Sequence, residues 1–240
     1  MRTLVLLLAA ATAEESAPAA DVDGYRSDRE VRAAVEDGPW RWTAGGGLWV
    51  VSSEATVSKD SIVGGGSIDE DGVIGFAVHV DAFRGPWGVS LEGTFLDVDE
   101  SGGSAPAQAE HATAHLAAYR RFGGGDTHVD ALAGFRLGSC SPDLQNGSVR
   151  RPWWDPTFGF RASHRVSERW RLAVRGDVGG FTLGSASDLT WQIEAFLYYG
   201  ITGRAEAGVG YRHLDIDYAT GGLRFRQRAG GPMVVVLVTF

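Results

Sequence analysis

Cysteine, lysine and long apolar runs are scarce in this 240-residue chain. The single cysteine, Cys140, excludes an intrachain disulfide framework and a cysteine-rich metal site. No apolar run reaches the roughly 18 residues of a membrane-spanning helix, which excludes a transmembrane helix bundle. Proline occurs only 8 times, so the chain is not a proline- and glycine-rich low-complexity sequence. Lys59 is the one lysine among 22 basic residues.

Acidic residues outnumber basic ones, 30 to 22, and the formal net charge is −8. This balance argues against nucleic acid as a partner. Apolar residues make up 44% of the chain, which is enough for a buried core, and glycine is abundant at 34 residues.

The first 20 residues have the layout of a secretory signal peptide. Arg2 supplies the positive start, residues 4–11 are apolar, and small residues with Ala-x-Ala spacing follow. The alternative is a buried N-terminal helix. Residues 21–39 are polar and acidic, and we interpret them as a periplasmic tether.

From Trp40 onward, segments of alternating apolar and polar residues are separated by glycine-rich or charged breaks. Their length suits transmembrane β-strands, which need about 9–11 residues. The ten segments are 40–51, 72–83, 87–97, 111–122, 127–138, 157–166, 169–179, 189–199, 203–213 and 230–240.

The breaks between these segments alternate between short and mostly long, which is typical of outer-membrane barrels. The long breaks, interpreted as loops, are 52–71, 98–110, 139–156, 180–188 and 214–229. The sequence therefore predicts an all-β fold over residues 40–240: a closed, antiparallel, up-and-down transmembrane β-barrel in a Gram-negative outer membrane. We expect about ten strands, with eight as the alternative, and strands too short to stand high above the membrane.

The last segment indicates how the barrel is inserted. Val234, Val236, Val238 and Phe240 alternate along one strand face, and the chain ends at the phenylalanine. This ending resembles the C-terminal signal that the barrel-assembly machinery recognises, so we expect that machinery and outer-membrane lipids as partners.

Aromatic residues gather near the chain entry and the short turns. Rings prefer the depth of the lipid headgroups, which predicts an aromatic girdle there. The alternative is the core of a soluble β-sandwich. The predicted girdle consists of Trp40, Trp42, Trp87, Phe122, Trp170 and Phe240.

The opposite strand face carries charges of both signs in near balance. In a narrow barrel, arginines that face carboxylates fill the lumen, because buried charge must be paired. We predict a salt-bridged, largely plugged lumen, and the alternative is a narrow pore for ions or small polar solutes. The lumen set is Arg41, Asp81, Glu92, Asp130, Arg136, Arg161, Arg165, Arg171, Arg175, Asp177, Glu194, Glu206 and Arg212. Within it, we expect Asp177 to pair with Arg161 or Arg212.

Charges outside this set mark the two ends of the barrel. Arginines near the short turns (Arg84, Arg120, Arg121, Arg169 and Arg204) are placed to pair with anionic headgroups. Acidic residues in the long breaks are candidate contacts for divalent cations, and the alternative is that they are simply solvated. These acids are Glu54, Asp60, Asp69, Glu70, Asp71, Asp97, Asp99 and Glu100.

Residues 153–240 resemble small, uncharacterised bacterial outer-membrane β-barrel proteins, with OmpA-like, OmpW-like and opacity-type barrels as broader relatives. The resemblance implies a fold and a location, and it brings no established activity. The stretches that carry it are Trp154–Pro156, Gly159–Arg161, Arg175–Phe181, Gly184–Ser185, Trp191–Gln192, Gly210–Tyr218 and Gly231–Phe240.

Two chemical alternatives remain beside a structural or surface-interacting role. Asp97 and Asp99 with His213 and Asp215 resemble the acid and histidine pairs of omptin proteases, although the His and Asp stand in the opposite order. This makes an outer-rim hydrolase the alternative function. His79, His111, His115 and His128 are candidate metal ligands, but they need not lie near one another, and the alternative is that each donates to a carboxylate. We therefore assign no catalytic residue, metal or cofactor.

Overall fold

The structure is a computed structural model that describes residues 38–59, 62–100, 107–144, 147–148, 151–183, 186–220 and 223–240. The predicted signal peptide and residues 21–37 of the predicted tether lie outside these ranges.

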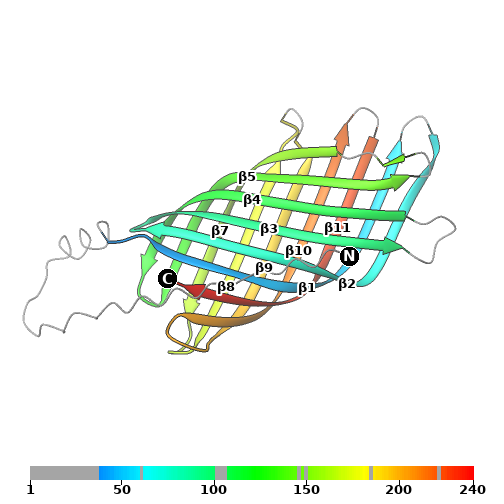
Figure 1. The fold of residues 1–240 in the computed structure, drawn as a ribbon. Coiled ribbons are helices and arrows are strands. Elements are labelled where there is room, and N and C mark those ends of the chain that lie inside the picture. The colour runs from blue at the N-terminus through cyan, green and yellow to red at the C-terminus, as the bar shows by residue number, and fades with distance from the viewer. Residues whose placement is uncertain are drawn as a thin grey trace, which may run out of the picture.

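Ten long strands form a closed antiparallel barrel (Figure 1), which confirms the predicted fold class and the strand number of ten over eight. Each strand pairs with its neighbours, and β4 pairs with β5 to close the ring. The described part of the chain holds no helix with the length and hydropathy of a membrane span. The strands are β1 (Arg41–Lys59), β2 (Ile62–Arg84), β3 (Trp87–Glu100), β4 (Ala107–Gly124), β5 (Thr127–Leu144), β7 (Arg151–Arg165), β8 (Trp170–Gly180), β9 (Leu189–Gly200), β10 (Ala205–Thr220) and β11 (Leu223–Thr239), with the two-residue β6 (Gly147–Ser148) beside β5.

The two ends of the barrel differ. At one end, which we call the terminus end, β1 begins beside the close of β11: the Phe240 amide donates to the Trp42 carbonyl at 2.8 Å. The β2–β3, β4–β5, β7–β8 and β9–β10 turns lie at this end. The other strand connections lie at the opposite end, which we call the hairpin end.

The strands are much longer than the sequence patterns predicted. β2 has 23 residues and β1 has 19, and the ranges 52–71 and 214–229, interpreted as loops, are mostly strand. The expectation that the chain is too short for tall strands is therefore wrong. Among the side chains that the structure describes in these ranges, polar ones such as Glu54, Thr56 and Arg226 lie on the outer face, where apolar side chains were expected.

The outer face changes character along the barrel. Large apolar side chains are exposed over the half nearer the terminus end, and on β11 they give way to arginines toward the hairpin end. Phe240 and Arg228 are separated by about 40 Å along the strand. At the usual tilt of 35–45°, that corresponds to about 30 Å along the barrel axis, close to the height of an outer-membrane apolar belt. From Phe240, which directly follows β11, the outward series runs back along the strand through Val238, Val236, Val234, Pro232, Gly230, Arg228, Arg226 and Arg224.

The interior changes in the opposite sense. Charged side chains fill the middle of the lumen, and apolar side chains such as Trp49, Leu96 and Ile216, each 0% exposed, fill it toward the hairpin end. A barrel in lipid has its apolar face outward, and a barrel in water has it inward. We call this reversal the polarity inversion. The prediction that ionic side chains occupy the interior therefore describes only part of the lumen.

Candidate functional site: the barrel lumen

The structure places the thirteen charged residues of the predicted lumen set on the inner side of the wall. Asp81, Asp130, Arg136, Arg175, Asp177 and Arg212 are buried, and the others line a cavity described below. Their common orientation follows from strand alternation, because residues two apart share a face.

Asp130 joins three neighbouring strands. The register sets it directly opposite Arg121 on β4 and Arg161 on β7. Arg121 Nε donates to Asp130 Oδ1 at 2.8 Å, and Arg161 Nη2 donates to Asp130 Oδ2 at 2.8 Å. Arg161 also reaches across the lumen to Asp81 Oδ2 on β2, at 2.7 Å. This arrangement ties β7 to a strand that is not its neighbour.

Asp177 belongs to a second network. Its partners are Arg136, which donates to Oδ1, and Arg175, whose Nε lies 3.3 Å from Oδ2. The expected pairing of Asp177 with Arg161 or Arg212 is therefore wrong, because Arg136 and Arg175 are the arginines that reach its carboxylate. Arg175 also contacts Glu92, and its Nη2 lies 2.5 Å from His115 Nδ1.

Arg212 completes this network. Its Nε lies 3.3 Å from Glu194, its Nη2 donates to Gln192 at 3.0 Å, and its guanidinium lies 5.1 Å from the centre of the Trp49 ring. Arg212 thus joins the charged and apolar parts of the lumen. We call the set Glu92, Arg136, Arg175, Asp177, Glu194 and Arg212 the ionic layer.

Beyond the ionic layer, toward the hairpin end, apolar side chains meet across the lumen. Trp153 lies against Tyr218 with ring centres 6.1 Å apart. Gly138 on β5 makes room for the Trp153 ring, because a Cβ at this position would overlap it. We call this set the apolar layer: Trp49, Leu96, Trp153, Leu214, Ile216, Tyr218 and Phe225.

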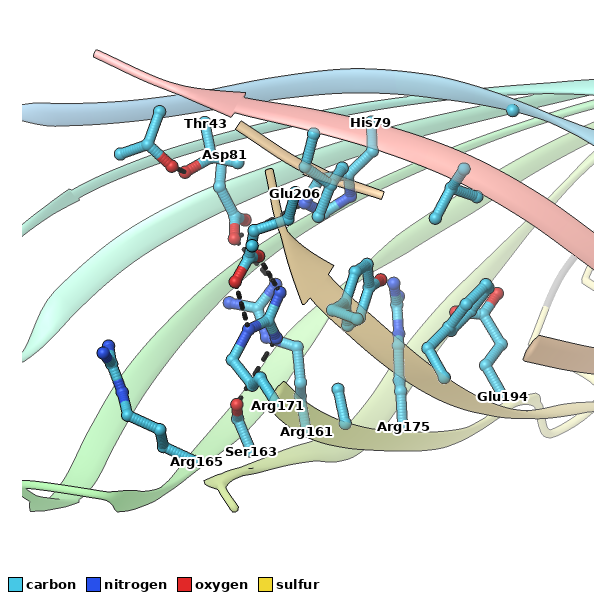
Figure 2. Close-up of a pocket in the computed structure, with 18 of the residues that line it drawn as sticks. Thr43, His79, Asp81, Arg161, Ser163, Arg165, Arg171, Arg175, Glu194 and Glu206 are labelled. Atoms are coloured by element: carbon cyan, nitrogen blue, oxygen red, sulfur yellow. Dashed lines mark hydrogen bonds and ion pairs between the residues drawn. The ribbon is translucent and has the colours of Figure 1, made fainter. Parts of the chain in front are cut away.

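Toward the terminus end, the lumen opens into a cavity of about 560 Å³, which we call the vestibule (Figure 2). Arg171 and Glu206 face each other there, with Arg171 Nε donating to Glu206 at 3.1 Å. Ser163 lies beside them, and Arg165 points away from this pair (Figure 2). Glu92, Arg175, Glu194 and Arg212 of the ionic layer form the inner end of the vestibule.

The residues of the predicted girdle and insertion signal lie on the outer face. Trp40, Trp42, Trp87, Phe122, Trp170 and Phe240 are exposed near the terminus end, as are Val234 and Val236 along β11, and Val238 is partly exposed. The Arg120 guanidinium lies 5.4 Å from the centre of the Trp87 ring and 5.2 Å from that of Phe122. Arg120 is therefore held among the rings of the girdle.

On the outer face toward the hairpin end, arginines of β11 pair with aspartates of β10. Arg228 Nε lies 3.2 Å from Asp215, and Arg224 Nε lies 3.3 Å from Asp217. The hydrogen bond from Arg224 to Asp217 raises the pKa of this guanidinium.

The pairs considered for a hydrolase do not gather in the lumen. The His213 ring packs on Trp191 at the outer face, with ring centres 4.9 Å apart, and Asp215 is paired with Arg228. Asp97 and Asp99 are in β3, but their side chains lie outside the described part of the structure, as does that of His111.

No group of three or more metal-ligating side chains occurs among the residues that the structure describes. Of the acids considered for divalent cations, Glu54 and Asp71 are exposed. The side chains of Asp60, Asp69, Glu70 and Glu100 lie outside the described part.

Sequence reasoning missed several lumen residues. Arg121 was interpreted as a headgroup contact because it lies near a turn, yet its side chain enters the lumen. His79, 3.5 Å from Asp81 and 3.3 Å from Glu92, joins the charged networks. Asp155 is fully buried and accepts bonds from the Ser187 amide and the Thr190 hydroxyl, both at 2.7 Å. Strand alternation was the available signal for His79 and Asp155, which share a strand face with Asp81 and Arg161. No predicted lumen residue lies on β4, so Arg121 had no such signal.

Comparison with solved structures defines the class of fold. The outer membrane protease OmpT from Escherichia coli matches with a TM-score of 0.59 at 11% identity, over 86% of this chain and 100% of that chain. Weaker matches include Neisserial surface protein A, with a TM-score of 0.41 at 12% identity over 84% and 97% of the two chains. The attachment invasion locus protein Ail of Yersinia pestis gives 0.38 at 10% identity over 83% and 98%.

The fold is that of a bacterial outer-membrane β-barrel, and the resemblance inferred from sequence is confirmed at that level. At 11% identity the likeness to OmpT shows the fold alone. No family model and no curated protein matches this chain.

Proposed function

We propose that this protein is a structural, non-conducting barrel of the bacterial outer membrane. Its terminus end faces the periplasm, and its hairpin end stands outside the membrane as a surface for interaction. The outward apolar belt and the girdle near the terminus end support membrane insertion. The polarity inversion supports a bilayer boundary near Arg228, because charged side chains on the outer wall require water.

The observation that carries the proposal is the filled lumen. The ionic layer crosses it first, with its arginines paired to carboxylates, and the apolar layer follows. Trp49, Leu96 and Ile216 are 0% exposed, so the apolar layer leaves no room for water beside these side chains. A dry apolar constriction excludes ions.

Planar-bilayer recording of the full-length protein tests the proposal. We expect no stable channels from the wild type. The double variant Trp49→Ala/Leu96→Ala removes apolar volume from the lumen and should produce measurable conductance. Leu48→Ala is the matched control, because Leu48 precedes Trp49 but is exposed on the outer face.

Stable open channels from the wild-type protein would contradict the proposal and favour the narrow pore. Heat-modifiable electrophoretic mobility of each variant establishes that the barrel is folded before it is recorded. A silent Trp49→Ala/Leu96→Ala barrel that is folded would show that the apolar layer is not the barrier.

A further inference from the structure

The vestibule has an excess of positive charge. Nine arginines and five carboxylates line it. Asp130 lies behind the lining and pairs with Arg121 and Arg161. When Asp130 is included, three positive charges remain without a negative counterpart, although the whole chain carries a net charge of −8. The excess is therefore a local property of this cavity.

Arg41, Arg165 and Arg204 make up the excess when Arg169, which donates to the Tyr199 hydroxyl at 3.0 Å, is counted against Glu168. Arg161 and Arg171 are each paired with a carboxylate. Within the part of the chain that the structure describes, the side chains of Arg41, Arg165 and Arg204 have no ion pair or hydrogen bond. They belong to different segments: the start of β1, the end of β7 and the turn before β10. Their guanidinium groups are free to bind a solute.

The shape of the vestibule suits a small solute. Its volume of about 560 Å³ falls in the range of roughly 300–1,000 Å³ found for ligand pockets. The ionic and apolar layers close its inner end, so a solute enters and leaves at the terminus end. A cleft lined by one sign of charge between low-dielectric walls concentrates ions of the opposite sign.

The lining also supplies hydroxyl groups. Thr43 and Thr239 lie with their Oγ1 atoms 3.1 Å apart, and Ser163 lies within hydrogen-bond distance of Arg171. An arginine binds phosphate oxygens through two parallel N–H groups, and hydroxyls donate to the remaining oxygens. Because the hydroxyl and guanidinium groups of the lining face the lumen, the barrel wall separates them from the headgroups of surrounding lipids.

We propose that the vestibule is a binding site for a small phosphate-bearing solute with at least two negative charges. Arg41, Arg165 and Arg204 bind its oxygens, and the hydroxyls of the lining complete the contacts. This inference goes beyond the structural role proposed above. Its test does not depend on the orientation of the barrel in the membrane, because binding is measured on the detergent-solubilised protein.

Isothermal titration calorimetry with inorganic pyrophosphate tests the site, using the full-length protein in a zwitterionic detergent at low salt. We expect saturable binding to the wild type and at least tenfold weaker binding to the variant Arg41→Gln/Arg165→Gln. The matched control is Arg224→Gln/Arg226→Gln, which removes the same charge from the outer face at the hairpin end. We expect its Kd to stay within twofold of the wild type.

Three outcomes would overturn the proposal. They are no binding of pyrophosphate to the folded wild type, an unchanged Kd in Arg41→Gln/Arg165→Gln, and an equal loss of affinity in Arg224→Gln/Arg226→Gln. Competition by acetate as strong as that by pyrophosphate would also overturn it, because the site would not select multiple charge. Arg41 and Arg165 are exposed and make no ion pair that the barrel needs, so we expect the double variant to fold. Heat-modifiable electrophoretic mobility verifies this.

Discussion

The Asp130 carboxylate is 0% exposed and lies between Arg121 and Arg161. Removing one partner of a buried ion pair leaves the other charge desolvated and uncompensated. We expect Asp130→Asn to lower the free energy of unfolding by about 3 kcal/mol, as measured by urea unfolding in detergent micelles with tryptophan fluorescence.

Asp126→Asn is the control for this substitution, because Asp126 is exposed in the neighbouring β4–β5 turn. Its effect should stay within about 0.5 kcal/mol, as for ordinary surface substitutions. Equal effects of the two substitutions would show that the Asp130 network contributes nothing beyond surface charge.

At the residue scale, the sequence predicts which face a side chain occupies better than it predicts the partner of that side chain. Orientation follows from the two-residue period of a strand, which is local. Partners across the lumen depend on how neighbouring strands are staggered around the barrel. Asp177 illustrates this: its inward orientation is readable from its neighbours, but its pairing with Arg136 and Arg175 is not.

The β8–β9 connection contains unusual backbone conformations. Gly180, Phe181 and Thr182 have φ values of 98°, 66° and 54°. The left-handed region is costly for a β-branched residue, by about 1–3 kcal/mol. We expect Thr182→Gly to raise the free energy of unfolding by about 1 kcal/mol, after the entropic cost of glycine is subtracted. Urea unfolding in micelles measures the change.

Thr202→Gly in the β9–β10 turn is the matched control. Thr202 has no positive φ, and its hydroxyl accepts bonds from the amides of Arg204 and Ala205, at 3.2 and 3.0 Å. Because Thr202→Gly removes this hydroxyl, it should lower the free energy of unfolding by about 1 kcal/mol. If both substitutions destabilise the barrel alike, the conformation at Thr182 stores no strain.

At the scale of strands, the sequence predicted the number, order and direction of the long elements. The predicted extent of the strands toward the hairpin end was wrong, because apolar residues were expected on the outer face along the whole of each strand. In the second half of β1, Ser52, Glu54 and Thr56 face outward, and Val51 and Ala55 face inward. The alternation is present there in reverse. Period alone does not show which face meets lipid or water, so these residues were interpreted as loop.

At the scale of the whole molecule, the polarity inversion links packing to location. Near the terminus end, the barrel has the organisation of a membrane protein, with paired charges inside and apolar side chains outside. Toward the hairpin end, it has that of a protein in water, with the apolar layer inside and ion pairs such as Arg228–Asp215 outside. The same continuous strands therefore face lipid near the terminus end and water toward the hairpin end. The position of the polarity inversion predicts where the bilayer surface lies.

Cysteine accessibility tests that boundary. In a Cys140→Ser background, single substitutions Val234→Cys and Arg226→Cys place thiols on the same outer face of β11. They lie about 26 Å apart along the strand. In liposomes exposed to a membrane-impermeant maleimide on both sides, we expect labelling of Arg226→Cys and protection of Val234→Cys. After the bilayer is dissolved in detergent, both should react. Labelling of Val234→Cys as fast as Arg226→Cys in intact liposomes would show that the apolar belt does not lie in lipid.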